Sequence, residues 1–110
     1  MTTITIKTDH DRIIGFRVQG HSGYAEEGSD IVCAAVSSTV TLVSAVVNDV
    51  LGLAASFKVN EEDTSVTFRL PGGLSDEDDF ACQSLLTGLV VYFTQLHDEH
   101  PDNIEVLEED

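Results

Sequence analysis

Cys33 and His21 are the two residues of this sequence best suited to nucleophilic chemistry. The stretch Gly20–Ser29 contains three glycines, two adjacent glutamates and no long apolar run, which indicates a loop, and we expect an apolar helix to follow from Ile31. With Asp30 as the N-cap, Cys33 would be the third helical residue, where the aligned peptide dipoles favour a thiolate. An imidazole brought back by the loop would favour the thiolate further and could carry a proton. Free N–H groups at the helix start could stabilise an oxyanion, so the stretch offers the parts of an acyl-transfer site.

Each of these residues also has a purely structural interpretation. A cysteine in the first turn of an apolar helix is more often a small core residue than a nucleophile. A single histidine at the end of a strand is more often structural than catalytic, and Asp30 needs no role beyond capping. Cys33 and His21 are twelve positions apart, and whether they meet depends on the path of the loop.

The motif itself resembles a known family. Gly20–Ala25 followed by Gly28–Ser37 closely resembles the ribosomal-processing cysteine protease family, Prp, and the order of elements is similar over nearly the whole chain. The resemblance implies a homodimeric cysteine endopeptidase that removes the N-terminal extension of a large-subunit ribosomal protein, L-twenty-seven, during ribosome maturation. It implies Cys33 as the nucleophile and His21 as its partner. The supporting or substrate-binding positions that it implies are Gly20, Gly23, Asp30 and Ser37.

The roles of the supporting residues stay open at this stage. The charge of Asp30 would disfavour a thiolate if it faced Cys33, so we expect it to cap the helix or to anchor the loop or the substrate backbone. Ser37 lies one turn beyond Cys33, where its hydroxyl could line the cleft or bond back to the helix. The loop glycines predict a loop that is partly disordered without substrate and closes to bring His21 to Cys33.

The charge of the chain excludes some partners. Five Lys and Arg against twenty Asp and Glu give a formal net charge of -15, which argues against nucleic acid or anionic membrane as the main partner and favours a basic one. No basic residue follows Arg69, so the C-terminal part is strongly negative. A device for solubility explains this acidity as well as a binding role does.

Several features favour a cytoplasmic protein with reduced thiols. Cys33 and Cys82 are too few for a disulfide scaffold, and the start of the chain lacks the pattern of a signal peptide. The stretch Ile31–Phe57 has no basic residue and a single acid, Asp49. Because its flanks are acidic and it contains several polar residues, we interpret it as a buried helix of a soluble domain rather than a membrane span.

The pattern of elements predicts a single protease-like domain over residues 1–110. Its fold class is α+β, a two-layer sandwich of order β-β-α-β-β-α-(β) with two helices on one face of a mainly antiparallel sheet. Period-two alternation gives the strands and helical spacing gives the helices, with Ser75 capping the second. The expected strands are 3–8, 14–18, 57–60, 65–70 and a short edge strand at 104–107, and the expected helices are 31–55 and 76–100.

The first helix also predicts a homodimer. It is apolar nearly all round, so the sheet can cover one side and a second copy of the chain the other; the small residues that would permit close approach are Ala34, Ala35, Ser38, Ser44 and Ala45. We expect no cofactor and no metal, since His97 and His100 have ligand spacing but no matching cluster. The rival functions are a non-enzymatic dimeric module that binds basic ribosomal proteins and a thiol redox sensor.

Overall fold

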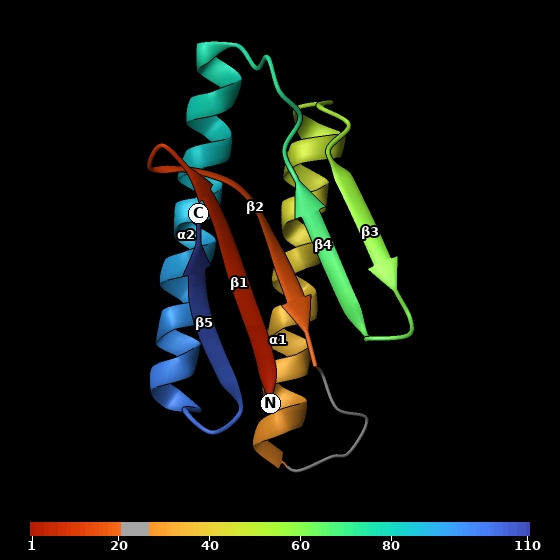
Figure 1. The fold of residues 1–110 in the computed structure, drawn as a ribbon, viewed down its shortest axis with the longest axis vertical. Coiled ribbons are helices and arrows are strands. Elements are labelled where there is room, and N and C mark those ends of the chain that lie inside the picture. The colour runs from red at the N-terminus through yellow and green to blue at the C-terminus, as the bar shows by residue number, and fades with distance from the viewer. Residues whose placement is uncertain (21–26) are drawn as a thin grey trace.

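A five-stranded sheet covered by two helices forms the molecule (Figure 1). The structure is a computed structural model that describes residues 1–20 and 27–110. Strands β1 and β2 come first, then helix α1 with its π-helical extension η1, then β3 and β4, then α2 and β5. Their bounds are β1 Thr2–Asp9, β2 Arg12–Gln19, α1 Glu27–Ser44, η1 Ala45–Val50, β3 Ser56–Asn60, β4 Ser65–Arg69, α2 Asp76–Glu99 and β5 Ile104–Glu109.

The predicted fold class is confirmed. The strand order is β3-β4-β2-β1-β5, and both helices lie on the same face of the sheet (Figure 1). The pairs β1–β2, β2–β4 and β3–β4 are antiparallel, whereas β5 pairs with β1 in parallel and makes the sheet mixed. The last strand can be parallel because it follows a whole helix, which gives the chain room to cross over.

Alternation along the strands places the core between sheet and helices. Ile4 and Ile6 of β1 and Phe16 and Val18 of β2 are buried on the helix side, and Phe68 of β4 joins them. The register pairs Val18 with Val66 and Phe16 with Phe68, so large side chains from strands distant in sequence share one layer. This register also fixes which strand residues lie opposite the start of α1.

The predicted bounds of the first helix are wrong at both ends. The helix begins at Glu27 rather than at Ile31 and ends at Val50 rather than at Ala55. Acidic residues are acceptable in a first helical turn because of the helix dipole, so nothing in the sequence forces a later start. At the other end Gly52 takes a φ of 67°, a left-handed conformation that ends a helix readily.

The predicted burial of α1 holds for one side only. Val32, Val36 and Val43 pack into the core, while Ile31 and Leu42 are more than half exposed. The stretch Ile31–Val50 is long and apolar enough to cross a membrane, with mean hydropathy 1.9. Core helices of folded domains reach the same values, so this property alone decides nothing about a membrane.

The second helix begins where the sequence predicts. The Ser75 hydroxyl accepts a hydrogen bond from the N–H of Asp78 at 3.1 Å, and four acidic residues follow in the first turn. Such residues satisfy the free N–H groups and favour the positive end of the helix dipole. After α2, β5 extends two residues beyond the predicted Leu107.

Candidate active site

The position of Cys33 on α1 differs from the prediction. Cys33 is six residues after Glu27, the first helical residue, and so lies in the second turn. Asp30 is within the helix rather than at its N-cap. The dipole effect fades after the first turn, and the N–H groups without an intrahelical acceptor belong to the first four residues. The helix terminus is therefore a weaker source of thiolate and oxyanion stabilisation at Cys33 than the sequence suggested.

A small cavity opens beside Cys33. The cysteine is free and half-buried, and it lines a cavity of about 60 Å³ between α1 and the sheet. Most of the lining is aliphatic, with Thr2, Ser37 and Cys33 as its polar members. The other residues that line it are Val18, Val36, Val40 and Val66. Cys33 therefore lies at an apolar cavity and, unlike the core residues, is not fully buried.

Ser37 lies near Cys33. Ser37 is exposed one turn beyond Cys33 and lines the same cavity. Its carbonyl accepts a hydrogen bond from the Thr41 hydroxyl at 2.9 Å. The exposure of Ser37 leaves its side chain available at the mouth of the site.

Gly20 marks the point where β2 ends beside the N-terminus. Its φ is 84°, and a Cβ at this position would lie 2.7 Å from the Met1 carbonyl oxygen. Both the conformation and the close approach require glycine. Gly20 thus fixes the direction in which the chain leaves β2, two residues after Val18 of the cavity.

His21 and Gly23 lie outside the residues that the structure describes, and so does most of the predicted mobile loop. Their assignment as catalytic partner and supporting residue therefore remains a prediction. The same holds for the role of the Asp30 side chain, although its backbone is helical.

Sequence reasoning missed the strand residues of the cavity. Thr2 is 3% exposed, and its N–H donates to the Asn103 carbonyl at 2.8 Å, which ties β1 to the start of β5. Alternation places Val18 and Val66 on the core side of their strands. Only the pairing of β2 with β4 shows that these two valines meet below Cys33.

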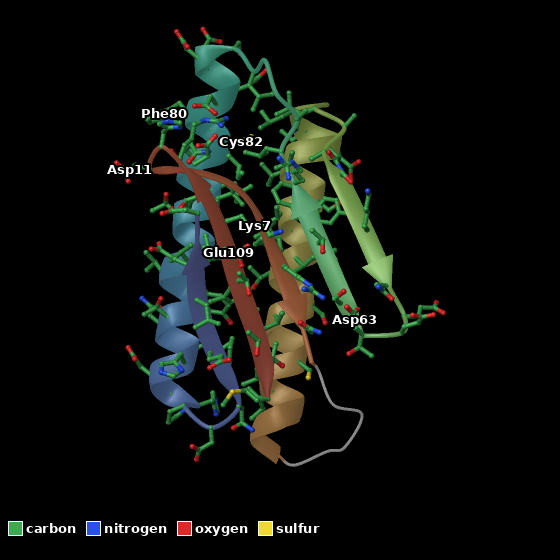
Figure 2. All side chains as sticks on the ribbon, in the orientation of Figure 1. Lys7, Asp11, Asp63, Phe80, Cys82 and Glu109 are labelled. Carbon is green, nitrogen blue, oxygen red and sulfur yellow. The ribbon has the colours of Figure 1, made fainter. Side chains whose placement is uncertain are left out.

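Cys82 has surroundings of another kind. It is fully buried among the core residues, on the side of α2 that faces the sheet (Figure 2). Burial raises the pKa of the Cys82 thiol, and the charges of Asp78 and Asp79 raise it further. A thiol in such a place stays protonated and inert.

Arg12 and Asp79 form an ion pair near Cys82. Arg12 Nε donates to an Asp79 carboxylate oxygen at 2.9 Å, and Arg12 Nη2 contacts the same oxygen. This hydrogen bond is the main reason why the pKa of Asp79 lies below its ordinary value, and it also raises the pKa of Arg12. The pair joins the start of β2 to the first turn of α2.

His97, near the end of α2, contacts the backbone at the start of β5. His97 is half-buried, and its Nδ1 lies 2.6 Å from the Ile104 carbonyl oxygen, so it joins α2 to β5. Within residues 1–20 and 27–110, no group of three His, Cys, Asp or Glu side chains could hold a metal ion.

Comparison with known proteins identifies the family. The family model described as cysteine protease Prp matches residues 1–105. The chain is 30% identical over 107 residues to the ribosomal processing cysteine protease Prp of Bacillus subtilis (strain 168), covering 96% of each chain. It therefore belongs to the Prp family and is a cysteine protease.

Solved structures agree on the fold. A crystal structure of the ribosomal processing protease Prp of S. aureus in complex with a substrate peptide superposes with a TM-score of 0.82 at 18% identity, covering 99% of this chain and 100% of that one. A Streptococcus mutans protein superposes with a TM-score of 0.83 at 22% identity, covering 98% and 93%. A second S. aureus Prp structure, with a covalently linked product peptide, gives 0.77 at 18% identity, covering 99% and 100%.

Proposed function

We propose that this cysteine protease is a ribosomal-processing endopeptidase that removes the N-terminal extension of the large-subunit ribosomal protein L-twenty-seven. The observation that carries the proposal is the half-buried Cys33 at the cavity between α1 and the sheet. The B. subtilis relative carries the name of a ribosomal processing protease. The family favours a protease over the two rival functions, a non-enzymatic binding module and a redox sensor, because its members are described as cysteine proteases.

The mechanism uses Cys33 as nucleophile and His21 as its proton carrier. The Cys33 sulfur attacks the scissile carbonyl carbon as a thiolate, His21 having taken the thiol proton. His21 then gives that proton to the leaving amine as the C–N bond breaks, which leaves a thioester on Cys33. Water attacks the thioester while His21 takes one of its protons. The C–S bond then breaks, the proton on His21 returns to the sulfur, and the carboxylic acid product departs and releases its own proton to water.

Chain geometry supports an approach of His21 to Cys33. His21 follows Val18 by three residues, and Val18 lines the cavity beside Cys33. Three residues of chain span at most about 10 Å. The S. aureus relative with a covalently linked product peptide fits a mechanism that passes through a bond to the enzyme.

The experiment is cleavage of the purified precursor of the ribosomal protein. We expect wild type to release the extension, while Cys33→Ser and His21→Ala leave the precursor whole. Mass spectrometry gives the new N-terminus of the product. Cleavage by the Cys33→Ser protein would overturn the assignment of the nucleophile.

Charge supports a basic substrate. A net charge of -15 attracts basic ribosomal proteins and raises the rate of encounter. We expect kcat/KM for the whole precursor to fall as salt rises. A value that does not change with salt would remove electrostatic attraction from the account.

The working form is a homodimer joined through the outer faces of α1 and α2. A groove of about 500 Å³ runs between the two helices on this side and is lined mainly by apolar groups, Leu42, Leu85 and Tyr92 among them. Leu42 is 57% exposed and Tyr92 40%. Ala34 and Ser38 lie exposed on the same side of α1 as Leu42 and allow close approach of a second copy.

Sedimentation tests the dimer. Leu42→Glu places a charge in the groove, and we expect it to yield monomers. Val59→Glu is the matched control, because Val59 is 70% exposed on β3, away from the groove. A Leu42→Glu protein that stays dimeric would show that the dimer interface does not include this groove.

The proposed compartment is the cytoplasm, with neither nucleic acid nor membrane as a partner. Cys33 and Cys82 are both free thiols, as the reducing cytoplasm keeps them. Fractionation of cells that carry a tagged chain would test the compartment, and recovery with membranes would contradict it.

A further inference from the structure

Among the described residues, no strand pairs with the outer edge of β5. β5 pairs with β1 on one side and is the last strand of the sheet. Edge strands expose backbone N–H and C=O groups to which another extended chain can add. Many proteins protect such an edge with lysine; β5 contains none, and three of its six residues are glutamates.

An apolar groove follows the same edge. It has a volume of about 400 Å³ and lies between β5 and α2. Val90 of α2 and Val106 of β5 are among its apolar walls, and His97 lies toward the start of β5. Glu105 and Glu108 are also among the residues that line it. The α2 residues of this groove are distinct from those of the proposed dimer groove.

The carboxylates at this edge are available for a cation. Among the described side chains, the ion pairs join His10 to Asp9, Arg12 to Asp79 and Arg17 to Asp63. Glu105 and Glu108 therefore have no cationic partner there.

Two neighbouring contacts define the limits of this charged edge. Glu105 accepts a hydrogen bond from the Thr3 hydroxyl at 3.2 Å, which orients it. Glu109 is not part of this charged edge, because the register places it opposite the cationic Lys7 (Figure 2).

The edge begins beside the candidate active site. Ile104, the first residue of β5, is the parallel partner of Thr2, which lines the Cys33 cavity. The start of α1 and the start of β5 lie at the same end of the molecule (Figure 1). Neighbouring strands are about 4.8 Å apart, so a bound chain that leaves Cys33 reaches β5 within a few residues.

We propose that the β5 edge, with the groove beside it, is a docking site for a basic, extended segment of the protein substrate outside the cleavage junction. This rests on the proposed function, since it takes the substrate to be a basic ribosomal protein. The segment adds to β5 as a further strand. Its lysine or arginine side chains meet Glu105 and Glu108, and an apolar side chain enters the groove beside Val90 and Val106.

Cleavage kinetics with two substrates test the docking site. The variant is Glu105→Gln/Glu108→Gln, and the control is Glu61→Gln/Glu62→Gln, which removes the same charge at the β3–β4 turn on the far edge of the sheet. For the whole precursor we expect the β5 variant to raise KM about 5-fold, with kcat little changed. For a short peptide restricted to the junction, and for the control with either substrate, we expect changes below about 2-fold.

Direct binding separates this proposal from the proposed function. The Cys33→Ser protein is titrated with a fluorescent peptide of the mature, basic N-terminal segment, with and without the β5 substitutions. Weaker binding only with the β5 substitutions supports the docking site. Equal losses in variant and control would mean general attraction, and no loss would overturn the site. Failure of wild type to cleave the precursor would refute the proposed function. The binding result would still test the docking site, because it does not depend on cleavage.

Discussion

The two cysteines of the chain lie on the two helices that cover one face of the sheet, in contrasting environments. Cys33 is half-buried at a small cavity near the end of β2. Cys82 is fully buried, and its surroundings raise its pKa. Position on the helix does not distinguish the two cysteines, since both occur within a few residues of a helix start. Burial does distinguish them, because of the two only Cys33 is partly exposed to solvent.

The largest expected difference is in activity. Cys33→Ser should lower kcat/KM for the precursor by about a thousandfold or more, because a hydroxyl is a far weaker nucleophile at neutral pH. Cys82→Ser, the same chemical change, should retain activity per folded molecule within about 3-fold. Cleavage assays normalised to folded protein measure both, and equal losses would contradict the contrast.

Alkylation gives the next difference. At about pH 7.5 we expect iodoacetamide to modify Cys33 at least about a hundredfold faster than Cys82, because Cys82 must wait for local opening and ionises reluctantly. Mass spectrometry of digested protein over time separates the two sites. Adding denaturant should make the rates similar, and a faster Cys82 in the native protein would refute its burial.

The free energy of unfolding should change more in Cys82→Ser than in Cys33→Ser, the reverse of the effect on activity. Cys82→Ser places a hydroxyl in the core and should lower the free energy of unfolding by about 1–3 kcal/mol. Cys33→Ser should change it by about 0.5 kcal/mol or less, because the site is partly open to water. Urea denaturation followed by circular dichroism measures both, and a large loss only at Cys33 would make that residue structural.

The smallest effect concerns the Arg12–Asp79 pair near Cys82. The folded pKa of Asp79 lies below the ordinary 3.8, so the pair stabilises the fold above that pH and the contribution is lost as pH falls through the folded value. Arg12→Gln should therefore be less stable than wild type near about pH 7, and the gap should narrow below about pH 3. Urea midpoints at the two pH values test this, with Lys58→Gln as the control because Lys58 is exposed and has no ion pair among the described residues. A stability difference between wild type and Arg12→Gln that grows in acid would contradict this prediction.

Much of the fold could be predicted from local patterns. Alternation of Ile4 and Ile6, or of Phe16 and Val18, has a fixed period that needs no tertiary context. Ser75 before an acidic run is an equally local signal, and the structure places the cap there. The predicted cap, Asp30, instead lies inside α1, which begins at Glu27 rather than at Ile31. Cys33 is therefore in the second turn of the helix and not in the first.

The candidate site divides in the same way. Residue type and the predicted helix single out Cys33, the family resemblance adds Ser37, and helical geometry alone places the two one turn apart. Thr2, Val18 and Val66 come from three different strands, and no local pattern says that they share a cavity. The pairing of β1, β2 and β4 does.

The amino-acid sequence by itself determined which segments form strands and helices, which faces are apolar, and that Cys33 lies near the start of an apolar helix, because each follows from short-range periodicity and chemistry. Only the tertiary structure decided that Cys33 opens onto a cavity while Cys82 is sealed, and that β5 offers a free edge beside it. Both outcomes depend on register and packing between segments far apart along the chain, where hydrophobic burial is shared among many residues and no single one encodes the contact.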